Sequence, residues 1–559
     1  MKITLQGFAG SNRAMHPKLL PDTVGVDSVN QNPGRGDLRP WRAPLNVATV
    51  PSPRQTIYRM GRDAPSDTVY WLSWTGVVHA MRGFIPDDTT ERTFYTGDGI
   101  PKQTDNTIAI ASAPYPTAWR ALGVPVPTVS PILTALTAGS ASDTEIRYYV
   151  FTYVTDKGEE SAPSPVSLPC SGKTDATWTI SNLAAPPAGP YGINRIRVYR
   201  TQTGQAGDTE FFFLREIVST LDTTTDDLRA LGEVLLTDGW LPPNPDMTNL
   251  TPMWNGMAAG IVPGGSVRYC VPYKPYAWPV AYESLPPDAK AVALGRIGQS
   301  LLVLTTAKPF LVSGASSDSL TDEPLEFGES CVSSRSVVSF GHGVAWACPD
   351  GLAYYGAGGP KILTNGIMTR DDWQAINPST IVGGAYEGAY IGFYTVGGVK
   401  KGFCIDPVSP AGIYWLETGY DSMFFDELQD ALYVLDGVNV RKWDAGESLM
   451  TATFRSKVFR AYATNFAAGR VIADSFPMTI KLEAQNLEAA AVTAILAARP
   501  GRYTAPNATT LRYTAAVADR KPFRLPGDFT ALDWQVEVSG TASVQQVVIA
   551  STMNELGEA

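Results

Sequence analysis

Three pairs of adjacent aspartates are the residues whose type and spacing could support general acid–base chemistry. The pairs are Asp87/Asp88, Asp226/Asp227 and Asp371/Asp372. Hydrolysis of a glycosidic bond needs two carboxyl groups, of which one donates a proton and the other acts as base or nucleophile. Successive residues of a strand, however, point to opposite faces of the sheet, and aspartates in loops are mostly solvated. We therefore predict no catalytic residue in these pairs.

Histidine and cysteine show no spacing that is typical of a metal site or a catalytic triad. The histidines are His16, His79 and His342. The last of them lies in a glycine-rich turn, where we expect a structural role. The cysteines are an odd number and widely scattered, namely Cys170, Cys270, Cys331, Cys348 and Cys404. This spacing argues against a disulfide framework or zinc, so we expect buried, reduced thiols, no cofactor and no metal.

Contact with phosphate groups is the third kind of chemistry to consider. The stretch from Gly356 to Pro360 is glycine-rich but lacks the Lys-Ser/Thr that follows in a phosphate-binding loop. A net charge of −10 and a pI near 5.0 argue against a grip on nucleic acid, which needs a concentrated basic surface. Acidic residues gather in one stretch, at Asp318, Asp322, Glu323, Glu326 and Glu329. They form either a solvated loop or a surface that repels phosphate.

Composition indicates a folded all-β protein. The 559 residues include 51 Gly and 43 Pro, which interrupt the chain too often for long helices. A charged fraction of 18% and a hydrophobic fraction of 44% are typical of a folded chain. No run approaches the ~18 apolar residues of a membrane helix, and the first seven residues lack the apolar core of a signal peptide. We therefore expect no membrane segment and synthesis in the cytoplasm without export.

A repeated pattern between Gly295 and Gly446 is the element that must position most other residues. Its copies start at Gly298, Gly341, Glu387 and Gln429, and these starts lie roughly 40 to 46 residues apart, which is within the range of known repeat periods. Each copy is a turn, an apolar strand, a second turn and a second strand. That pattern predicts propeller blades, which are stable only when stacked. Adding the hairpin after Met257 and the strands upstream, we expect about six blade-like units.

The chain divides into five segments. We predict an extended N-terminal arm over residues 1–56, the first propeller strands over 57–124, an inserted β-sandwich over 125–240, the propeller blades over 241–450 and a C-terminal β-domain over 451–559. The insertion resembles fibronectin type III domains in the runs YYVFTYVTDKGEESAPSP and INRIRVYRT. The stretch 487–499 is the one with helical propensity.

The arm is rich in Pro, Asn, Gly and Arg and has almost no periodic pattern. Two interpretations are open: an arm that docks on its own chain or on a neighbouring subunit, and a loose tail. Four apolar residues favour docking because they are poorly placed in water, namely Leu19, Leu20, Leu38 and Trp41.

Several short motifs together resemble the tail nozzle proteins of short-tailed bacteriophages, also called tail tubular protein B. In the second half of the chain they are Cys331–Val338, Pro349–Leu352, Leu363–Thr364, Thr369–Trp373 and Tyr386–Tyr394. The run Gly10–Pro21, the segment Tyr273–Pro279 and the closing DWQVEVSG are similar to the same family. The likeness covers most of the chain, and its motifs concern fold and packing and mark no reactive site.

The resemblance implies a structural virion protein of the phage tail, assembled in the host cytoplasm. It implies a homo-hexameric ring below the head-to-tail adaptor, with tail fibre or spike proteins on its outer surface. Double-stranded DNA would pass through the axial channel without specific binding. Six copies would carry a charge of about −60, and an acidic channel would repel phosphates at short range because salt screens beyond ~10 Å.

Two alternatives come from other function classes. The first is a carbohydrate-binding tail adhesin, which the 13 Trp and 24 Tyr favour, although most of these rings are expected in cores. An adhesin at a fibre tip would be a trimer with coiled-coil or β-helical repeats, and neither pattern is present. The second is a propeller glycan-degrading enzyme that uses one of the aspartate pairs.

Overall fold

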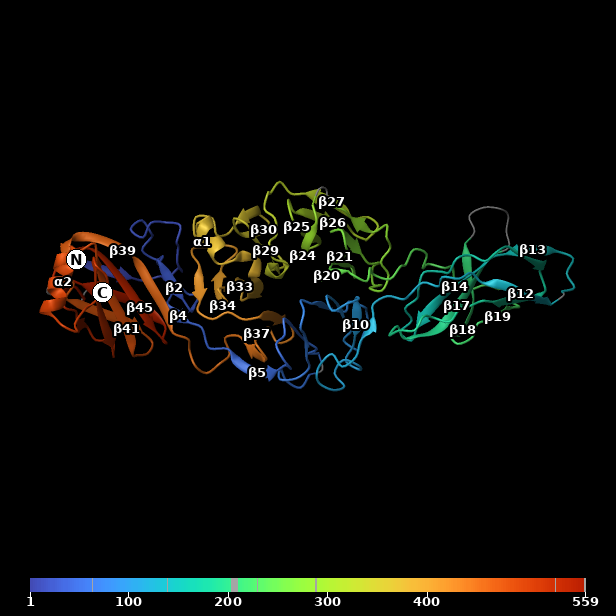
Figure 1. Ribbon diagram of the computed structural model, residues 1–559, viewed down its shortest axis with the longest axis horizontal. Coiled ribbons are helices and arrows are strands. Elements are labelled where there is room, and N and C mark those ends of the chain that lie inside the picture. Colours follow the sequence, from blue (N-terminus) through green and yellow to red (C-terminus); the bar gives the residue numbers. More distant parts are fainter. Residues whose placement is uncertain are drawn as a thin grey trace. The chain divides into compact units, whose positions relative to one another are not determined.

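The computed structural model describes residues 1–62, 64–137, 139–202, 210–228, 230–286, 289–527 and 529–556 (Figure 1). This part of the chain is built almost wholly of strands, which confirms the all-β class. Within it, the α-helices are α1 (Arg370–Ala375) and α2 (Ala489–Ala498), and short 3-10 turns lie at Ser334–Ser336, Pro378–Thr380 and Asn554–Leu556. The chain forms two compact units: residues 1–69 with 329–559, and residues 70–328.

The unit of residues 70–328 contains three four-stranded antiparallel sheets in which each strand pairs with the next in sequence. The first consists of β8 (His79–Arg82), β9 (Thr93–Thr96), β10 (Lys102–Thr104) and β11 (Arg120–Ala121). The second consists of β20 (Thr248–Pro252), β21 (Ala258–Ile261), β22 (Val267–Tyr269) and β23 (Glu283–Ser284). The third consists of β24 (Ala291–Ile297), β25 (Ser300–Thr305), β26 (Phe310–Ser313) and β27 (Thr321–Pro324). Strand β7 (Trp71–Trp74) precedes them.

The unit of residues 1–69 and 329–559 contains three further runs of four antiparallel strands. One consists of β28 (Val338–Ser339), β29 (Gly343–Cys348), β30 (Gly351–Gly356) and β31 (Gly359–Ile362). The next consists of β32 (Val382–Tyr386), β33 (Ala389–Val396), β34 (Val399–Ile405) and β35 (Tyr414–Leu416). The last consists of β36 (Ser422–Asp426), β37 (Ala431–Asp436), β38 (Asn439–Lys442) and, from the N-terminal segment, β5 (Leu45–Thr49).

The predicted repeat corresponds to these sheets. Each expected start lies just before the second strand of a sheet, so that Gly298 precedes β25, Gly341 precedes β29 and Gln429 precedes β37. Strands β25, β29 and β37 are buried along nearly their whole length, which requires that both faces of each sheet be covered. Four-stranded meanders of this kind are the units from which propellers are built, and the described residues form six of them.

The insertion forms three small sheets. They are β12–β16–β19, β13–β15 and β14–β17–β18. Their bounds are β12 (Ile132–Thr137), β13 (Thr144–Arg147), β14 (Tyr149–Thr155), β15 (Cys170–Lys173), β16 (Thr177–Ser181), β17 (Ile193–Thr201), β18 (Phe211–Val218) and β19 (Thr224–Asp226). The buried Phe151, Trp178 and Val198 belong to one core with Phe94 of β9 and with Trp278, which lies between β22 and β23. The core of the insertion is therefore continuous with apolar residues of the neighbouring sheet and loop.

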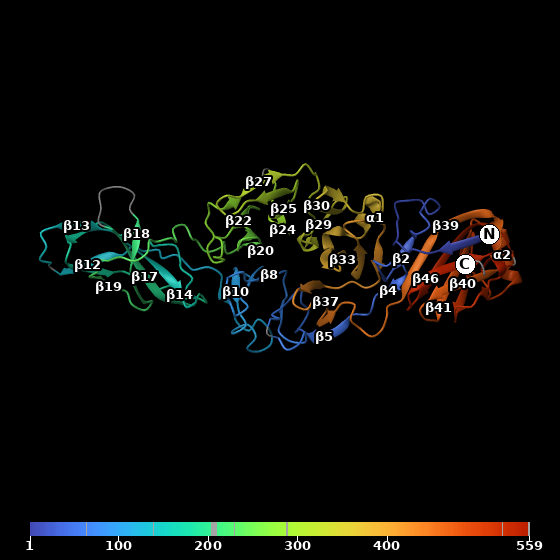
Figure 2. The same ribbon diagram turned by 180° about the vertical axis from the view of Figure 1, so that it is seen from behind.

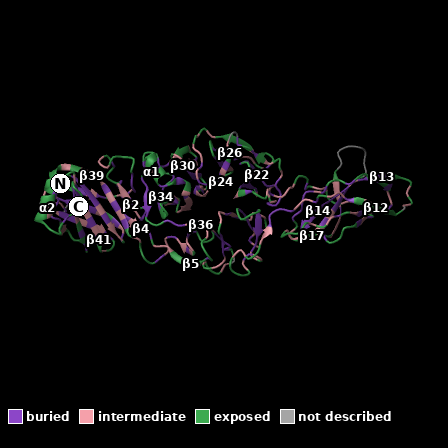
Figure 3. Ribbon diagram, in the orientation of Figure 1, coloured by how far each residue is buried: buried purple, intermediate pink, exposed green. Residues whose placement is uncertain are grey.

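The C-terminal segment packs two sheets face to face. The larger is the far half of a ten-stranded sheet whose order is β32–β33–β34–β35–β2–β39–β45–β41–β43–β42. The new strands are β2 (Asp27–Val29), β39 (Ala452–Thr464), β41 (Met478–Gln485), β42 (Thr504–Asn507), β43 (Thr510–Val517) and β45 (Ala531–Gly540). The smaller sheet is β1 (Lys2–Leu5), β46 (Val544–Ala550), β40 (Ala468–Ala473) and β44 (Phe523–Arg524). Buried residues alternate with partly buried ones along the first part of β39 and of β41, because one face of each strand lies on the core. Figure 3 colours the strands of this segment by burial.

The N-terminal arm lies against its own chain. Strand β1 pairs with β46 near the C-terminus, and both ends lie close together in Figure 2. Strand β2 lies between β35 and β39, and β3 (Gln31–Asn32), β4 (Arg39–Pro40) and β6 (Thr56–Arg59) complete the segment. Leu20, Leu38 and Trp41 are buried as expected. Leu19 is 72% exposed, contrary to the expectation, so it takes no part in docking.

Candidate functional site

In each of the three aspartate pairs, hydrogen bonds, an ion pair or the backbone conformation tie the residues to the surrounding fold. Asp372 and Thr369 cap helix α1: the Asp372 amide donates to the Thr369 hydroxyl at 3.1 Å, and that hydroxyl donates to the Asp372 carboxylate at 2.7 Å. Reciprocal bonds of this kind stabilise the first turn of a helix. Asp371 lies in the same first turn, where a carboxylate is favourable beside the helix N-terminus.

Asp88 closes a tight turn before β9. Its carboxylate accepts hydrogen bonds from the Thr90 hydroxyl at 2.7 Å and from the Arg92 amide at 2.8 Å. Burial raises the pKa of Asp88, but these hydrogen bonds outweigh it and the pKa is lowered. Asp87, with φ of 59°, takes a backbone conformation of the turn itself. The pair thus shapes a loop.

Asp226 and its neighbour differ completely in environment. Asp226 is fully buried and accepts hydrogen bonds from Arg147 at 2.7 Å, Tyr149 at 2.8 Å and Arg200 at 3.0 Å. Asp227 lies at the surface in an ion pair with Arg215 at 2.6 Å. The two carboxyl groups therefore cannot act together on one substrate bond.

The histidines and cysteines are dispersed. His16 accepts a hydrogen bond from the Lys18 amide at 3.2 Å, His79 lies on β8, and the His342 ring lies 6.0 Å from that of Phe340. All five cysteines are buried free thiols, as expected. Over the described ranges of the chain, no group of three or more His, Cys, Asp or Glu side chains could hold a metal ion. No helix in those ranges is long and apolar enough to cross a membrane.

The acidic stretch from Asp318 to Glu329 lies on an edge strand and the loops around it. Asp322 and Glu323 belong to β27, the outermost strand of its sheet, and all four residues of that strand are exposed. Charges and proline on an edge strand prevent pairing with other chains. Glu326 forms an exposed ion pair with Lys308 at 2.9 Å, and Asp318 is also exposed. Glu329 contributes, after burial, to raising the pKa of Cys348.

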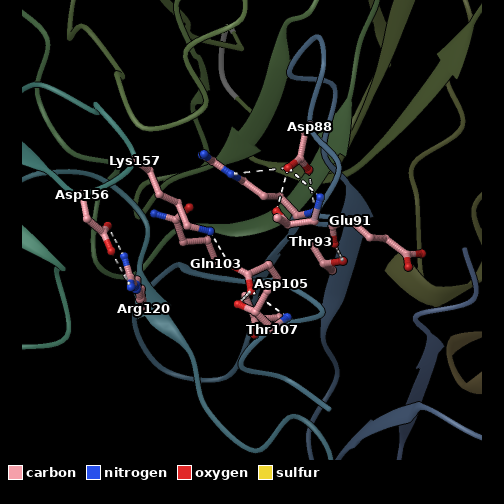
Figure 4. Close-up of polar contacts among 12 residues, drawn as sticks. Asp88, Glu91, Thr93, Gln103, Asp105, Thr107, Arg120, Asp156 and Lys157 are labelled. Carbon is pink, nitrogen blue, oxygen red and sulfur yellow. Dashed lines mark hydrogen bonds and ion pairs between the residues drawn. The ribbon is translucent and has the colours of Figure 1, made fainter. Parts of the chain in front are cut away.

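A polar cluster joins the turn 156–160 of the insertion to the sheet β8–β11 (Figure 4). Lys157 forms an ion pair with the buried Asp105. The Arg120 guanidinium donates two hydrogen bonds to the Asp156 carboxylate, one of them from Nη2 to Oδ2 at 2.9 Å. We call this cluster the insertion joint. It consists of Asp105, Arg120, Asp156 and Lys157, together with Glu159 and its partners Arg92 and Gln103. Such a network fixes the insertion to its neighbouring sheet.

Glu159 is the buried centre of the insertion joint. Its carboxylate accepts hydrogen bonds from Arg92 and from Gln103, each at 3.0 Å. Burial raises the pKa of Glu159 despite these partners, because removal of a carboxylate from water disfavours its charged form. No motif in the sequence marks this cluster, since its members come from segments up to 67 positions apart.

A cavity of about 500 Å³ lies beside the insertion joint, and sequence reasoning missed it. Its walls come from four places: the turn residues Gly158 and Glu160, strands β17 and β18, the segment 232–240 that leaves the insertion, and the loop around Lys274 and Tyr276. Arg197 and Tyr199 belong to the run INRIRVYRT, so the resemblance to fibronectin domains covers one wall only. The volume is within the range of small-molecule sites.

Most of the motifs that carry the resemblance lie in the unit of residues 1–69 and 329–559, whereas Tyr273–Pro279 lies in the unit of residues 70–328. Ser11 donates its hydroxyl hydrogen to the carbonyl of Ile413 at 2.8 Å, and Asn12 donates to Gly366 at 2.7 Å. Tyr390 donates to the carbonyl of Ser336 at 2.9 Å. The motif residues therefore connect strands and chain ends, as expected for packing motifs.

Comparison with known proteins adds only distant likenesses. No protein-family model and no curated protein matches the chain. Among solved structures, the WD40 domain of Pan2 from Neurospora crassa has a TM-score of 0.24 and 5% identity, covering 49% of this chain and 86% of that one. The WD40 domain of Toxoplasma gondii coronin has a TM-score of 0.23 and 12% identity, covering 73% and 91%. A putative exported protein of Bacteroides fragilis has a TM-score of 0.24 and 10% identity, covering 57% and 98%.

Proposed function

We propose that this protein forms the nozzle of a short-tailed phage: a hexameric ring that continues the channel of the head-to-tail adaptor. The observation that supports the proposal most directly is that some of the resembling motifs contact one another, as Tyr390 and Ser336 do. The N-terminal run Gly10–Pro21 bonds to Ile413 and Gly366, and it also reaches the closing motif through Lys18 and Asp533. Hydrogen bonds that join distant segments of the chain in this way are suited to the subunit of a ring that bears mechanical load.

In this proposal the mechanism is geometric and electrostatic. The ring carries double-stranded DNA without gripping it, because each Lys or Arg paired with phosphate would add affinity and so friction. The net charge of −10 per subunit supports repulsion. Tail fibre or spike proteins attach to the outer surface, and the protein acts in the virion tail after assembly in the host cytoplasm.

The test is the mass and symmetry of the purified protein, measured by native mass spectrometry and negative-stain imaging. The protein is examined alone and mixed with the adaptor protein encoded by the same genome, since ring formation can require a template. We expect six-fold rings with an open axis in at least one of the two samples. Persistent monomers or trimers that ignore the adaptor would overturn the proposal.

A hydrolysis assay with variants of the aspartate pairs distinguishes the nozzle from a glycan-degrading enzyme. Purified protein is incubated with polysaccharides and the release of reducing ends is measured. We expect no release above that of a heat-denatured sample. Release that disappears in D372N or D88N but not in D227N would favour the glycan-degrading enzyme instead.

A further inference from the structure

The cavity beside the insertion joint is a built pocket with aromatic walls. Tyr199 and Phe213 meet edge to face with ring centroids 5.9 Å apart, and Trp240 and Tyr276 meet in the same way at 6.1 Å. Trp240 and Phe213 are half-buried, so part of each ring remains open to a ligand. Large rings held by their neighbours offer contact area at little conformational cost.

One set of polar groups in the cavity is already committed to the protein. Glu160 accepts hydrogen bonds from the hydroxyls of Thr152 and Tyr199, each at 2.6 Å, and from Arg197 at 2.7 Å. Arg197 also donates to Glu216 at 2.9 Å. This network holds the floor of the cavity rigid. The charge of Arg197 is already compensated by the two glutamates, so it is not available to bind an anion.

A second set of polar side chains in the cavity has no partner among the residues that the structure describes. The Lys274 ammonium and the Glu233 carboxylate line the cavity, and neither has a hydrogen bond or ion pair to any residue that the structure describes. The hydroxyl of Thr237, a lining residue that is 5% exposed, likewise lacks a partner among the described residues. Of these three groups the Thr237 hydroxyl is the buried one, whereas Lys274 is half-buried and Glu233 is exposed. A buried polar group without a partner is costly and needs an explanation in a native fold.

We propose that this cavity binds a sugar residue of an oligosaccharide. A pyranose ring has apolar C–H faces that fit against Trp240 and Phe213. Its hydroxyls both donate and accept, so they can satisfy Lys274 and Glu233 at the same time. A purely apolar ligand would desolvate these two charges without compensation. A phosphorylated ligand would meet two glutamates and only one uncommitted cation, Lys274.

This inference goes beyond the nozzle proposal and does not depend on it. A ring subunit with a sugar-binding pocket on its insertion could hold a cell-surface glycan during ejection. Ring formation is measured by mass and symmetry, whereas the pocket is measured by binding. Failure of one measurement therefore leaves the other proposal standing.

The experiment is a screen of the full-length protein on an array of bacterial surface oligosaccharides, followed by calorimetric titration of each sugar that binds. W240A and K274M should each weaken binding by about tenfold or more, as expected for central contacts. E233Q should also weaken it. Circular dichroism spectra and melting temperatures of the variants show that they are folded.

Matched controls are W119A and K290M, which remove the same residue types from the same unit outside the cavity. Both should bind sugar like the unchanged protein. Absence of binding to every oligosaccharide on the array would overturn the inference. Binding that W240A and K274M leave intact would overturn it too, because the sugar would then lie elsewhere.

Discussion

Lys18 donates a hydrogen bond to Asp533 across 2.8 Å, although the two residues are 515 positions apart. The Asp533 side chain is only 4% exposed, and Asn486 also donates to it. Burial raises the pKa of Asp533, but Lys18 and Asn486 outweigh burial and the pKa is lowered. This contact fastens the N-terminal arm to the C-terminal sheet.

Replacement K18M should loosen the arm and destabilise the protein by about 1–2 kcal/mol, because a buried carboxylate loses its cation. The measurement is hydrogen exchange of the first 30 residues, with urea unfolding. Since the pKa of Asp533 is depressed in the folded state, its contribution is present above the ordinary value of 3.8 and is lost as pH falls below it. K18M should therefore lose less stability on acidification than the unchanged protein.

The control for K18M is K521M, because Lys521 is 85% exposed and lies 4.0 Å from Asp519. Exposed pairs of this kind contribute little to stability. Equal exchange of the arm in K18M and K521M would show that the Lys18 contact does not hold it.

Asp226 and Asp227 are neighbours with opposite expected effects. D226N should destabilise the insertion by about 3–5 kcal/mol, because the buried Arg147 and Arg200 would each lose an ion pair with the buried Asp226 carboxylate. D227N should change stability by less than about 0.5 kcal/mol. Tryptophan fluorescence reports this loss of stability, because the Arg147 guanidinium lies 4.5 Å from the centroid of the Trp178 ring. Similar unfolding midpoints for the two variants would contradict the buried cluster.

Glu159 should give a pH dependence of the opposite sign to that of Asp533. Its pKa is raised in the folded state, so the unchanged protein gains stability relative to E159Q as pH falls through the folded-state pKa toward the ordinary value of 4.5. The measurement is the unfolding midpoint of both proteins between pH 8 and pH 4.5, at spacings of about half a unit.

E216Q provides the comparison for E159Q. Hydrogen bonds from Arg197 and Arg195 outweigh burial and lower the pKa of Glu216, so its stabilising contribution is present above 4.5 and is lost as pH falls below that value. Above pH 4.5 the difference between E216Q and the unchanged protein should hence stay constant. A constant difference for E159Q over the same range would falsify the burial argument.

The five thiols should resist a water-soluble thiol reagent in the folded protein. Burial raises the pKa of Cys270, Cys331 and Cys404, each to about 12, so no reactive thiolate forms near neutral pH. Labelling should be slow in buffer and reach all five cysteines in denaturant. Rapid labelling of any cysteine in the folded state would reveal a local opening that the structure does not contain.

Local signals in the sequence were sufficient for the secondary structure. The turns before Ser300, Gly343 and Ala431 combine glycine or polar residues with apolar runs, and strands β25, β29 and β37 begin there. Helix α2 appears within the predicted range 487–499. Helix α1 was not predicted, because its six residues are too few for a periodic pattern.

The sequence by itself determined the all-β class, the repeat and the free cysteines, because composition, turn residues and apolar alternation act over a few positions. Only the tertiary structure decided that β5 completes the sheet of β38, that Asp226 is buried while Asp227 is not, and that Trp240 and Lys274 share a cavity. These are pairings between distant segments. Their energies depend on burial and on partners that local periodicity does not specify.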